Sequence, residues 1–161
     1  MRAHGRDFVT ASTALDATAL SNAPIPASHL DLLQRPICGV LTTLFPDGEP
    51  HSSLMWLDFD GECARINTTY ERAHAHNLLR DPRASLLVVD PDDTSRFIAI
   101  RGSIELQREN AIGHLDALTQ KYTRFRAFYG FVYPAEQRFR EVRVIGRLHA
   151  RRITLDAIHA G

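Results

Sequence analysis

Short runs of apolar and β-branched residues, separated by turn residues, fill the first half of this chain. Runs at residues 37–45, 50–59 and 63–69 predict three consecutive strands. Pro46-Asp47-Gly48 and Asp60-Gly61 stand between them, and both have the chemistry of tight turns, in which glycine allows a positive φ. These segments therefore predict two consecutive β-hairpins that share their middle strand.

The second half of the chain adds three further strand patterns. The nearly continuous apolar run ASLLVVD, residues 84–90, predicts a strand that is covered on both faces. Residues 96–106 predict a longer strand, and Gly102 within it indicates a bulge or a close approach of two backbones. Residues 141–155 predict a last strand, and we expect its arginines on the solvent face, with one of them reaching a substrate groove as the alternative: Arg143, Arg147, Arg151 and Arg152.

Helical patterns are few. Ser28 has the chemistry of an N-cap for a short helix over residues 29–34. Residues 71–79 predict a second helix, which Asp81-Pro82 ends, and residues 109–122 predict an amphipathic third. Few helices among short strands with hairpin turns predict a mainly β, α+β fold, an antiparallel barrel decorated by helices.

Length and composition fit one globular domain. The chain has 161 residues, of which 44% are hydrophobic and 24% are charged. We expect residues 1–25, rich in Ala, Ser and Thr, to form a mobile tail and residues 26–161 to form a single domain. The 19 basic and 19 acidic side chains give no net charge, which argues against a nucleic-acid-binding surface. No apolar run approaches the length that spans a membrane.

The spacing of cysteines and histidines predicts no metal site. Cys38 and Cys63 lack the spacing of a metal or redox motif, and we expect two reduced thiols, as is typical of a cytoplasmic protein. His74 and His76 are two residues apart on a predicted helix, so they do not share a face. The sequence also lacks the motifs of a catalytic triad or of paired carboxylates, so the catalytic residues stay unknown.

The junction between the third strand and the second helix is the strongest candidate for ligand binding. A helix N-terminus offers free backbone N–H groups and a partial positive charge, both of which attract anions. Arg72 in this junction predicts charge-assisted binding of a phosphate, with a solvated helix side chain as the alternative. Asn67 and Thr68, at the end of the strand, predict phosphate contacts or helix capping.

Three stretches of the sequence resemble the pyridoxamine-phosphate-oxidase-like split β-barrel family, whose members bind FMN or a deazaflavin. The stretches are LTTLFPDGEPHSSLMWLDFDG, NTTYERAHAHNLLRDPRASLLVVDP and IAIRGSIEL, and the match covers roughly residues 30–106. The resemblance implies a split antiparallel barrel that forms a homodimer. It also implies a flavin-type cofactor in each of two grooves at the dimer interface.

In this family a Thr, followed by an Arg and a Lys at the start of a helix, binds the cofactor phosphate. The matching positions are Thr68, Arg72 and His74, so histidine stands where the family has lysine. Lysine is a fixed cation, whereas histidine is neutral at pH 7 unless a partner raises its pKa. If His74 binds phosphate as a cation, cofactor affinity falls as the pH rises. If His74 stays neutral, cofactor affinity does not change with pH around the pKa of His74.

The resemblance favours the deazaflavin coenzyme F-420 over FMN. Members that oxidise pyridoxamine phosphate carry an adjacent Arg-Lys pair on this helix, where this chain has Ala73-His74, and a basic residue on the preceding hairpin, which is neutral here. The Arg72-x-His74 spacing and the run from Asn77 to Arg83 resemble the deazaflavin-dependent reductases instead. The residues expected to hold the cofactor are Leu54, Met55, Trp56, Asn67, Thr68, Arg72, His74 and Asn77.

The sequence thus predicts a cytoplasmic, homodimeric reductase that transfers a hydride to an electron-poor C=C or C=N bond of a small conjugated substrate. The cofactor carries out this chemistry, and the protein binds the cofactor and orients the substrate. The alternatives are an FMN enzyme of the pyridoxamine-phosphate-oxidase type, a non-catalytic carrier or sensor of flavin, deazaflavin or haem, and an interaction module without cofactor. Trp56 has core packing or the dimer interface as its alternative role. For the aromatic residues within 122–140, core packing ranks ahead of a pocket wall.

Overall fold

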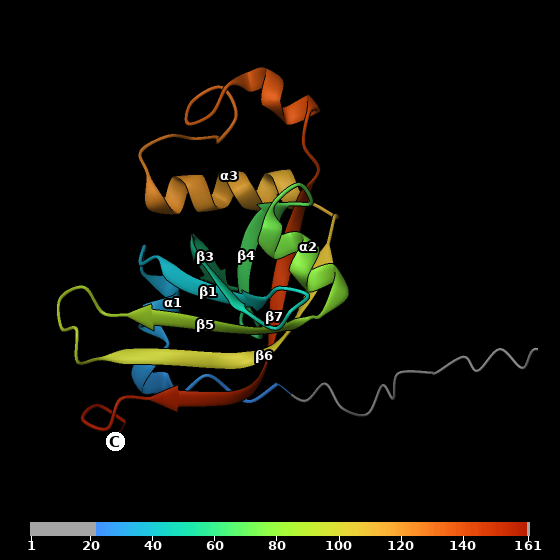
Figure 1. The fold of residues 1–161 in the computed structure, drawn as a ribbon. Helices are drawn as coiled ribbons and strands as arrows, with labels where there is room; N and C mark the ends of the chain where they lie inside the picture. Colours follow the sequence, from blue (N-terminus) through green and yellow to red (C-terminus); the bar gives the residue numbers. More distant parts are fainter. Residues whose placement is uncertain (1–21, 161) are drawn as a thin grey trace, which may run out of the picture.

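A computed structural model describes residues 22–160 of the chain (Figure 1). Its strands form one antiparallel sheet in the order β2-β1-β5-β6-β7-β4-β3. The seven strands of this sheet are β1 (Gly39–Leu44), β2 (Pro50–Met55), β3 (Leu57–Phe59), β4 (Ala64–Thr69), β5 (Arg83–Val89), β6 (Phe97–Gln107) and β7 (Arg143–Leu155).

The two edge strands show that this sheet closes on itself. β2 and β3 lie at opposite ends of the strand order, yet only Trp56 separates them along the chain. A flat sheet of this width would hold its edges roughly 28 Å apart, since neighbouring strands lie about 4.8 Å apart. One residue cannot span that gap, so the sheet must curl until its edges meet at Trp56. The predicted split antiparallel barrel is confirmed, and the predicted strand over residues 50–59 is two strands divided at this corner.

In the part of the chain that the structure describes, three α-helices and two short 3₁₀ helices decorate the barrel. α1 packs against β3 and β5, α2 against β1 and β6, and α3 against β4 and β7. In Figure 1, α3 and the segment that follows it form a separate layer above the sheet. Within residues 22–160, no helix has the length and apolar character needed to cross a membrane. The helices are η2 (Ala27–His29), α1 (Asp31–Gln34), α2 (Ala73–Arg80), α3 (Ala111–Tyr122) and η3 (Ala135–Phe139).

All three predicted helices begin two residues before the observed α-helices. α2 begins at Ala73, because Arg72 has extended backbone angles (φ −84°, ψ 145°) and is the N-cap. The expected N-cap Ser28 lies inside η2, where its hydroxyl oxygen is 2.9 Å from Nδ1 of His29, and Leu30 takes the N-cap position of α1. The hydroxyl of Ser28 therefore contacts a neighbouring side chain and does not cap α1.

The barrel interior is apolar and well filled. Leu32 and Leu33 of the short helix α1 are fully buried, as is Leu57 of β3. Burying one such side chain contributes about 1.5–3 kcal/mol relative to leaving it in water. The two cysteines are free thiols, with Cys63 buried and Cys38 partly exposed. Other core residues with almost no exposure are Leu41, Leu86, Val88, Ile98 and Ile100.

A buried hydrogen bond fastens a residue near the start of the described chain to one near its end. Nε2 of His29 lies 2.8 Å from Oδ2 of Asp156, and both side chains are almost fully buried. Asp156 also accepts a hydrogen bond from the backbone N–H of Phe97. Burial would raise the pKa of Asp156, but hydrogen bonds from His29 and from backbone N–H groups outweigh it and hold that pKa well below its usual range.

Of the predicted tail, residues 1–25, only the last few belong to the described chain. The backbone N–H of Ala23 donates to the carbonyl oxygen of Ala150 at 2.8 Å, and Ile25 packs against the core. Residues 1–21 lie outside the described residues.

β5 is covered on one face only, unlike the prediction for its apolar run. Ala84, Leu86 and Val88 are buried, whereas the alternate residues Leu87 and Val89 are partly exposed. The run is nearly continuous because the outer face is apolar as well. Leu87 pairs with Val40 of β1, and Val40 pairs with Leu54 of β2.

Gly102 lies at a bulge, as predicted. Arg101 pairs with Arg152 and Gly102 pairs with Ala150, which leaves Arg151 as the extra residue of β7. A Cβ atom on Gly102 would lie 1.9 Å from the carbonyl oxygen of His149. Only glycine allows the two backbones to approach so closely at this position.

We predict that Gly102→Ala lowers the free energy of unfolding by about 1–3 kcal/mol, because the added methyl group forces a backbone shift in β7. Urea unfolding followed by circular dichroism measures this change. Ser103→Ala, at the next position of β6, is the control and should change stability much less. A Gly102→Ala variant as stable as the wild type would contradict the close approach.

Candidate functional site

A cavity of about 580 Å³ opens where β2, the end of β4, the start of α2 and one face of α3 come together. The site residues that it contains were predicted from two separate stretches of sequence, residues 54–56 and 67–74, and the closure of the barrel brings these stretches together. The predicted residues that line the cavity are Leu54, Met55, Trp56, Asn67, Thr68, Arg72 and His74.

Asn77 is the predicted site residue that the structure places elsewhere. It lies one helical turn beyond His74, is almost fully buried, and donates a hydrogen bond from Nδ2 to Oγ1 of Thr43 at 3.0 Å. This bond ties α2 to β1 beneath it. Asn77 therefore holds the helix in place and does not line the cavity.

One end of the cavity is cationic. Arg72 is exposed at the N-cap of α2, and no side chain caps this helix within the described chain. The first-turn N–H groups of Ala73 and His74 consequently keep no helical carbonyl partner. A guanidinium group next to such a helix terminus is a suitable site for a phosphate or carboxylate. The alternative role of Asn67 and Thr68 as helix caps is not observed.

His74 lies buried at this cationic end with its ring held by two hydroxyl groups. Its Nε2 is 2.5 Å from Oγ1 of Thr68, and its Nδ1 is 3.4 Å from Oγ of Ser53. Burial, followed by the nearby positive charges of His51 and Arg72, lowers the pKa of His74 to about 4. The ring is neutral at pH 7 in this state, and Arg72 is left as the fixed cation of this end.

A hydrogen-bond network behind the cavity fixes the orientation of Asn67. Its Nδ2 donates to the carbonyl oxygen of Ala111 at 2.7 Å and lies 3.2 Å from Nδ1 of His114. Since Nδ1 of His114 must then accept, Nε2 carries the hydrogen and donates to Asp58, which also forms an ion pair with Arg65 at 2.7 Å. Burial opposes ionisation of Asp58, but the bonds from His114 and Arg65 outweigh it and lower its pKa to about 2.

The other end of the cavity is aromatic. The ring of Trp56 stacks on Tyr122 with a centroid distance of 5.2 Å and an interplanar angle of 8°, and Phe128 meets Trp56 edge-on. The hydroxyl of Tyr122 donates to the carbonyl oxygen of Ile37 at 2.7 Å, and burial raises the pKa of Tyr122 to about 12. Tyr122 thus supports the tryptophan from behind. The aliphatic part of this wall consists of Leu115, Leu118 and Val132.

Several lining residues escaped the sequence analysis. Arg143, expected on the solvent face of β7, lines the cavity and lies over the ring of Phe128, 5.0 Å from its centroid. Arg143 also forms an ion pair with Glu141 at 2.7 Å. Its position follows from the pairing of Arg143 with Thr69 at the end of β4, which the sequence does not reveal. The alternation of His51 with Ser53 on β2 was a usable signal, because both face the cavity.

The cavity therefore suits a planar, largely apolar ring that carries an anionic group. The aromatic wall can pack against such a ring, and Arg72 with the start of α2 can hold the anion. A split antiparallel barrel with this kind of cavity defines the class of flavin-type split-barrel proteins.

The chain belongs to the pyridoxamine 5'-phosphate oxidase family, whose model matches residues 25–155. It is similar to the solved structure of an F420 reductase, with 28% identity, a TM-score of 0.69, and coverage of 81% of this chain and 98% of that chain. A conserved hypothetical protein from Mycobacterium tuberculosis is similar as well, at 26% identity and a TM-score of 0.61, with coverage of 84% of this chain and 86% of that one. A putative pyridoxamine 5'-phosphate oxidase from Listeria innocua shares the fold, at 21% identity and a TM-score of 0.58, over 78% of this chain and 93% of that one.

The buried neutral His74 predicts a loss of stability in mildly acidic solution. Its pKa is about 4 in the folded protein against an ordinary value of 6.5, so the unfolded chain binds more protons between these pH values. Stability should therefore fall as the pH drops from 6.5 to 4. We predict that the urea midpoint of His74→Gln falls less steeply across this window than that of the wild type.

His76→Gln is the matched control, since His76 is exposed on the same helix and should keep the wild-type pH profile. Parallel profiles for His74→Gln and the wild type would contradict a buried, neutral His74.

Proposed function

We propose that this chain is a deazaflavin-dependent reductase that transfers a hydride to an electron-poor C=C or C=N bond of a small conjugated molecule. The observation that carries the proposal is a single cavity with Arg72 and a helix N-terminus at one end and the Trp56 wall at the other. Membership of the family and the 28% identity to an F420 reductase support the choice of cofactor.

The residues of the cavity fit a phosphate-bearing ring cofactor. Arg72 and the free amides of α2 would hold the phosphate, with the hydroxyls of Ser53 and Thr68 nearby, and Trp56 would pack against the ring. When bound, the cofactor supplies the hydride chemistry. The protein would contribute the aliphatic wall that excludes water and the geometry that brings a substrate to contact distance.

The charge at the phosphate end favours a deazaflavin over FMN. Arg72 is a fixed cation there, while the pKa of about 4 keeps His74 neutral at pH 7. The phosphate of FMN is a monoester with close to two negative charges at pH 7, since its second pKa is about 6. One guanidinium group with neutral hydrogen-bonding partners matches a singly charged phosphate better than a doubly charged one, so this end counts against FMN.

A non-catalytic carrier or sensor is the second candidate function. Neither a carboxylate nor a tyrosine is among the residues that line the cavity in the described chain, and the Tyr122 hydroxyl is bound to the backbone. A proton for the reduced product would have to come from solvent or from an imidazole or hydroxyl group of the lining, such as His51 or Ser53. Cofactor binding without oxidation of the reduced cofactor by any of a panel of conjugated acceptors would favour the carrier.

Trp56 makes cofactor binding measurable, because it is the one tryptophan of the chain and lines the cavity. We predict that F-420 quenches its fluorescence and binds more tightly than FMN. Arg72→Ala should weaken F-420 binding by about 1.5–3 kcal/mol, which is roughly 10- to 150-fold, because a hydrogen bond to a charged group is lost.

The control for this titration is Arg80→Ala, at the opposite end of α2 and outside the cavity lining, which should bind F-420 as the wild type does. Tighter binding of FMN would favour the FMN-dependent oxidase alternative. If Arg72→Ala binds F-420 as tightly as the wild type does, the assignment of Arg72 to the phosphate is wrong. If the wild type binds neither F-420 nor FMN, the enzyme proposal is wrong.

We further infer that the protein is a homodimer with the cofactor grooves at its interface. An apolar row crosses the outer face of β2, β1, β5 and β6, where Leu54, Val40, Leu87 and Ala99 are successive pairing partners. Leu54 is 72% exposed and Val40 is 36% exposed. A second copy placed on this row would remove apolar surface from water. Leu54 also lines the cavity, so the same contact would reach the cofactor groove.

Size-exclusion chromatography with light scattering tests the dimer. We predict a dimeric wild type and a Val40→Asp variant that dissociates to monomers, because a carboxylate would be buried in the interface. Ile158→Asp, at an exposed apolar residue outside the row, should remain dimeric. A monomeric wild type, or a Val40→Asp dimer as stable as the wild type, would contradict this interface.

A further inference from the structure

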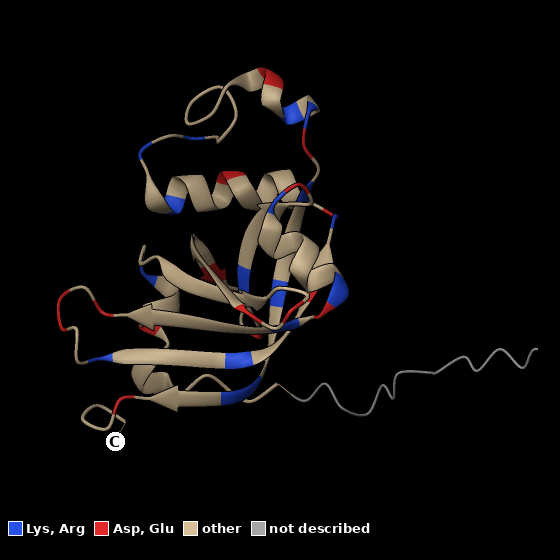
Figure 2. Cartoon of the chain, viewed as in Figure 1, with Lys and Arg blue, Asp and Glu red and all other residues tan. Residues whose placement is uncertain are grey.

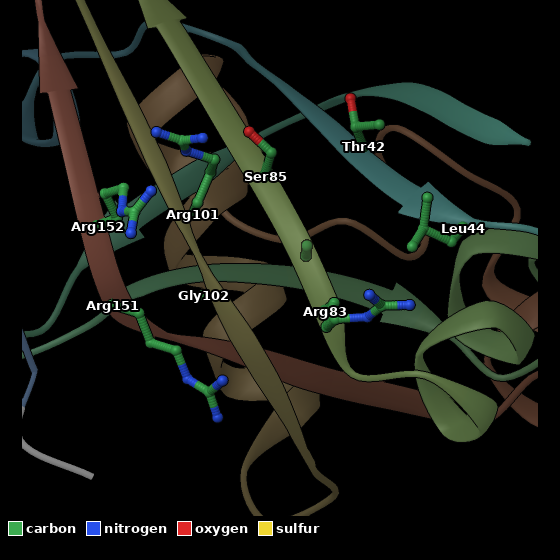
Figure 3. Close-up of a pocket in the computed structure, with 9 residues that line it drawn as sticks. Thr42, Leu44, Arg83, Ser85, Arg101, Gly102, Arg151 and Arg152 are labelled. Carbon is green, nitrogen blue, oxygen red and sulfur yellow. The ribbon is translucent and has the colours of Figure 1, made fainter. Parts of the chain in front are cut away.

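A second cavity of about 460 Å³ lies on the outer face of β1, β5, β6 and β7 (Figure 3). It shares no lining residue with the cavity around Arg72. Four of its lining residues are arginines and none is acidic: Arg83, Arg101, Arg151 and Arg152. Figure 2 shows basic residues on neighbouring parts of β6 and β7.

Strand pairing arranges hydrogen-bond donors in a row across this cavity. Thr42 of β1 pairs with Ser85 of β5, Ser85 with Arg101 of β6, and Arg101 with Arg152 of β7. Directly paired residues point to the same face of a sheet, so two hydroxyls and two guanidinium groups share one line. Two residues further along β1, β5 and β6 lies the apolar row to which we assign the dimer contact, so this row of donors borders that contact.

The bulge at Gly102 adds a third guanidinium to this face. Consecutive residues of a regular strand point to opposite faces, but Arg151 and Arg152 are both exposed and both line the cavity. Arg151 is the unpaired residue of the bulge, and a bulge re-aims a side chain in this way. Figure 3 shows Arg101 and Arg152 beside each other on adjacent strands, with Arg151 next along β7.

The arginines in this cavity repel one another without a carboxylate to offset the repulsion. Arg101 and Arg152 are direct cross-strand partners, an arrangement in which like charges are destabilising. Within residues 22–160, Arg101, Arg151 and Arg152 form no ion pair, whereas the guanidinium groups of Arg65 and Arg96 each contact carboxylates. Arg83, at the edge of the cavity, is paired with Asp81.

We propose that this cavity binds a multivalent oxyanion, a small molecule with two or more phosphate or carboxylate groups. The planar guanidinium group forms paired hydrogen bonds with either a phosphate or a carboxylate. Three guanidinium groups without carboxylate partners are best matched by a ligand with more than one such anionic group. The hydroxyls of Thr42 and Ser85 extend the donors along the same row. The volume is in the range of small-ligand pockets, which favours a small molecule over an extended polymer on a chain of zero net charge.

Isothermal titration calorimetry at low salt tests the proposal with pyrophosphate and citrate as probes and acetate as the monovalent comparison. We expect pyrophosphate or citrate to bind far more tightly than acetate and to weaken as salt is raised. The double variant Arg151→Ala/Arg152→Ala should lose at least about tenfold in affinity, since each lost bond involves two charged groups. Preference for pyrophosphate would assign phosphate groups to the natural ligand, and preference for citrate would assign carboxylates.

Arg124→Ala/Arg126→Ala is the matched control, because it removes the same charge from exposed residues outside the cavity. It should bind the probes as the wild type does. Arg151→Lys/Arg152→Lys keeps the charge without the planar guanidinium group and should bind more weakly than the wild type but more tightly than the alanine variant. If the alanine variant does not fold, the lysine variant and the rise in melting temperature of the wild type with pyrophosphate provide the test.

The proposal is overturned if neither probe binds the wild type, if acetate binds as tightly, or if the control loses as much affinity as the alanine variant. It is also overturned if the alanine variant changes oligomeric state and keeps full affinity, since the arginines would then serve a contact between copies. Titration of F-420 against the same variants separates this site from the proposed function. The alanine variant should bind F-420 as the wild type does whether or not the chain is a reductase.

Discussion

The closure of the sheet at Trp56 is the constraint on which the rest of the structure depends. Because one residue joins the two edge strands, β2 and the end of β4 must lie close together, although the strand order puts them far apart. That closure brings Ser53 within hydrogen-bond distance of His74, and it places Trp56 against Tyr122 of α3. Barrel geometry thus makes the cavity, and the side chains at the corner decide what the cavity can hold.

Burial and charge act against each other at the cationic end of the cavity. A lysine in place of His74 would add a second fixed cation beside Arg72, and its burial would cost solvation free energy until an anion arrived. Histidine avoids that cost by staying neutral, as the pKa of about 4 indicates. The chain therefore keeps a hydrogen-bonding group at this position and gives up part of the electrostatic attraction. This exchange is tolerable for a ligand with a single negative charge.

Features that depend on nearby residues in the sequence, such as turns and strands, were predicted well. Features that depend on contacts between distant parts of the chain were not. Turn residues and the alternation of apolar and polar residues located the strands, and Gly102 within a strand pattern predicted the bulge. The corner at Trp56 was missed, because the apolar alternation continues from one edge strand, β2, into the other, β3. Arg143 was missed because its partner Thr69 lies more than 70 residues earlier in the chain. Asn77 was assigned to the cofactor from the family resemblance, whereas in the structure it bonds to Thr43 and lies outside the cavity lining.

The chain has no net charge, but its acidic and basic side chains are unevenly distributed over the fold. Asp31 and Asp90 bind Arg96, and Asp58 binds Arg65, so these carboxylates are taken up within the fold. Such pairing leaves Arg72 at one cavity and the Arg101–Arg152 pair at another without acidic partners among the described residues. Surface repulsion of this kind weakens the folded state and is retained more readily where a ligand relieves it. The arrangement of unpaired arginines, more than their number, thus distinguishes the two cavities, and it is the basis for proposing a ligand of different charge for each.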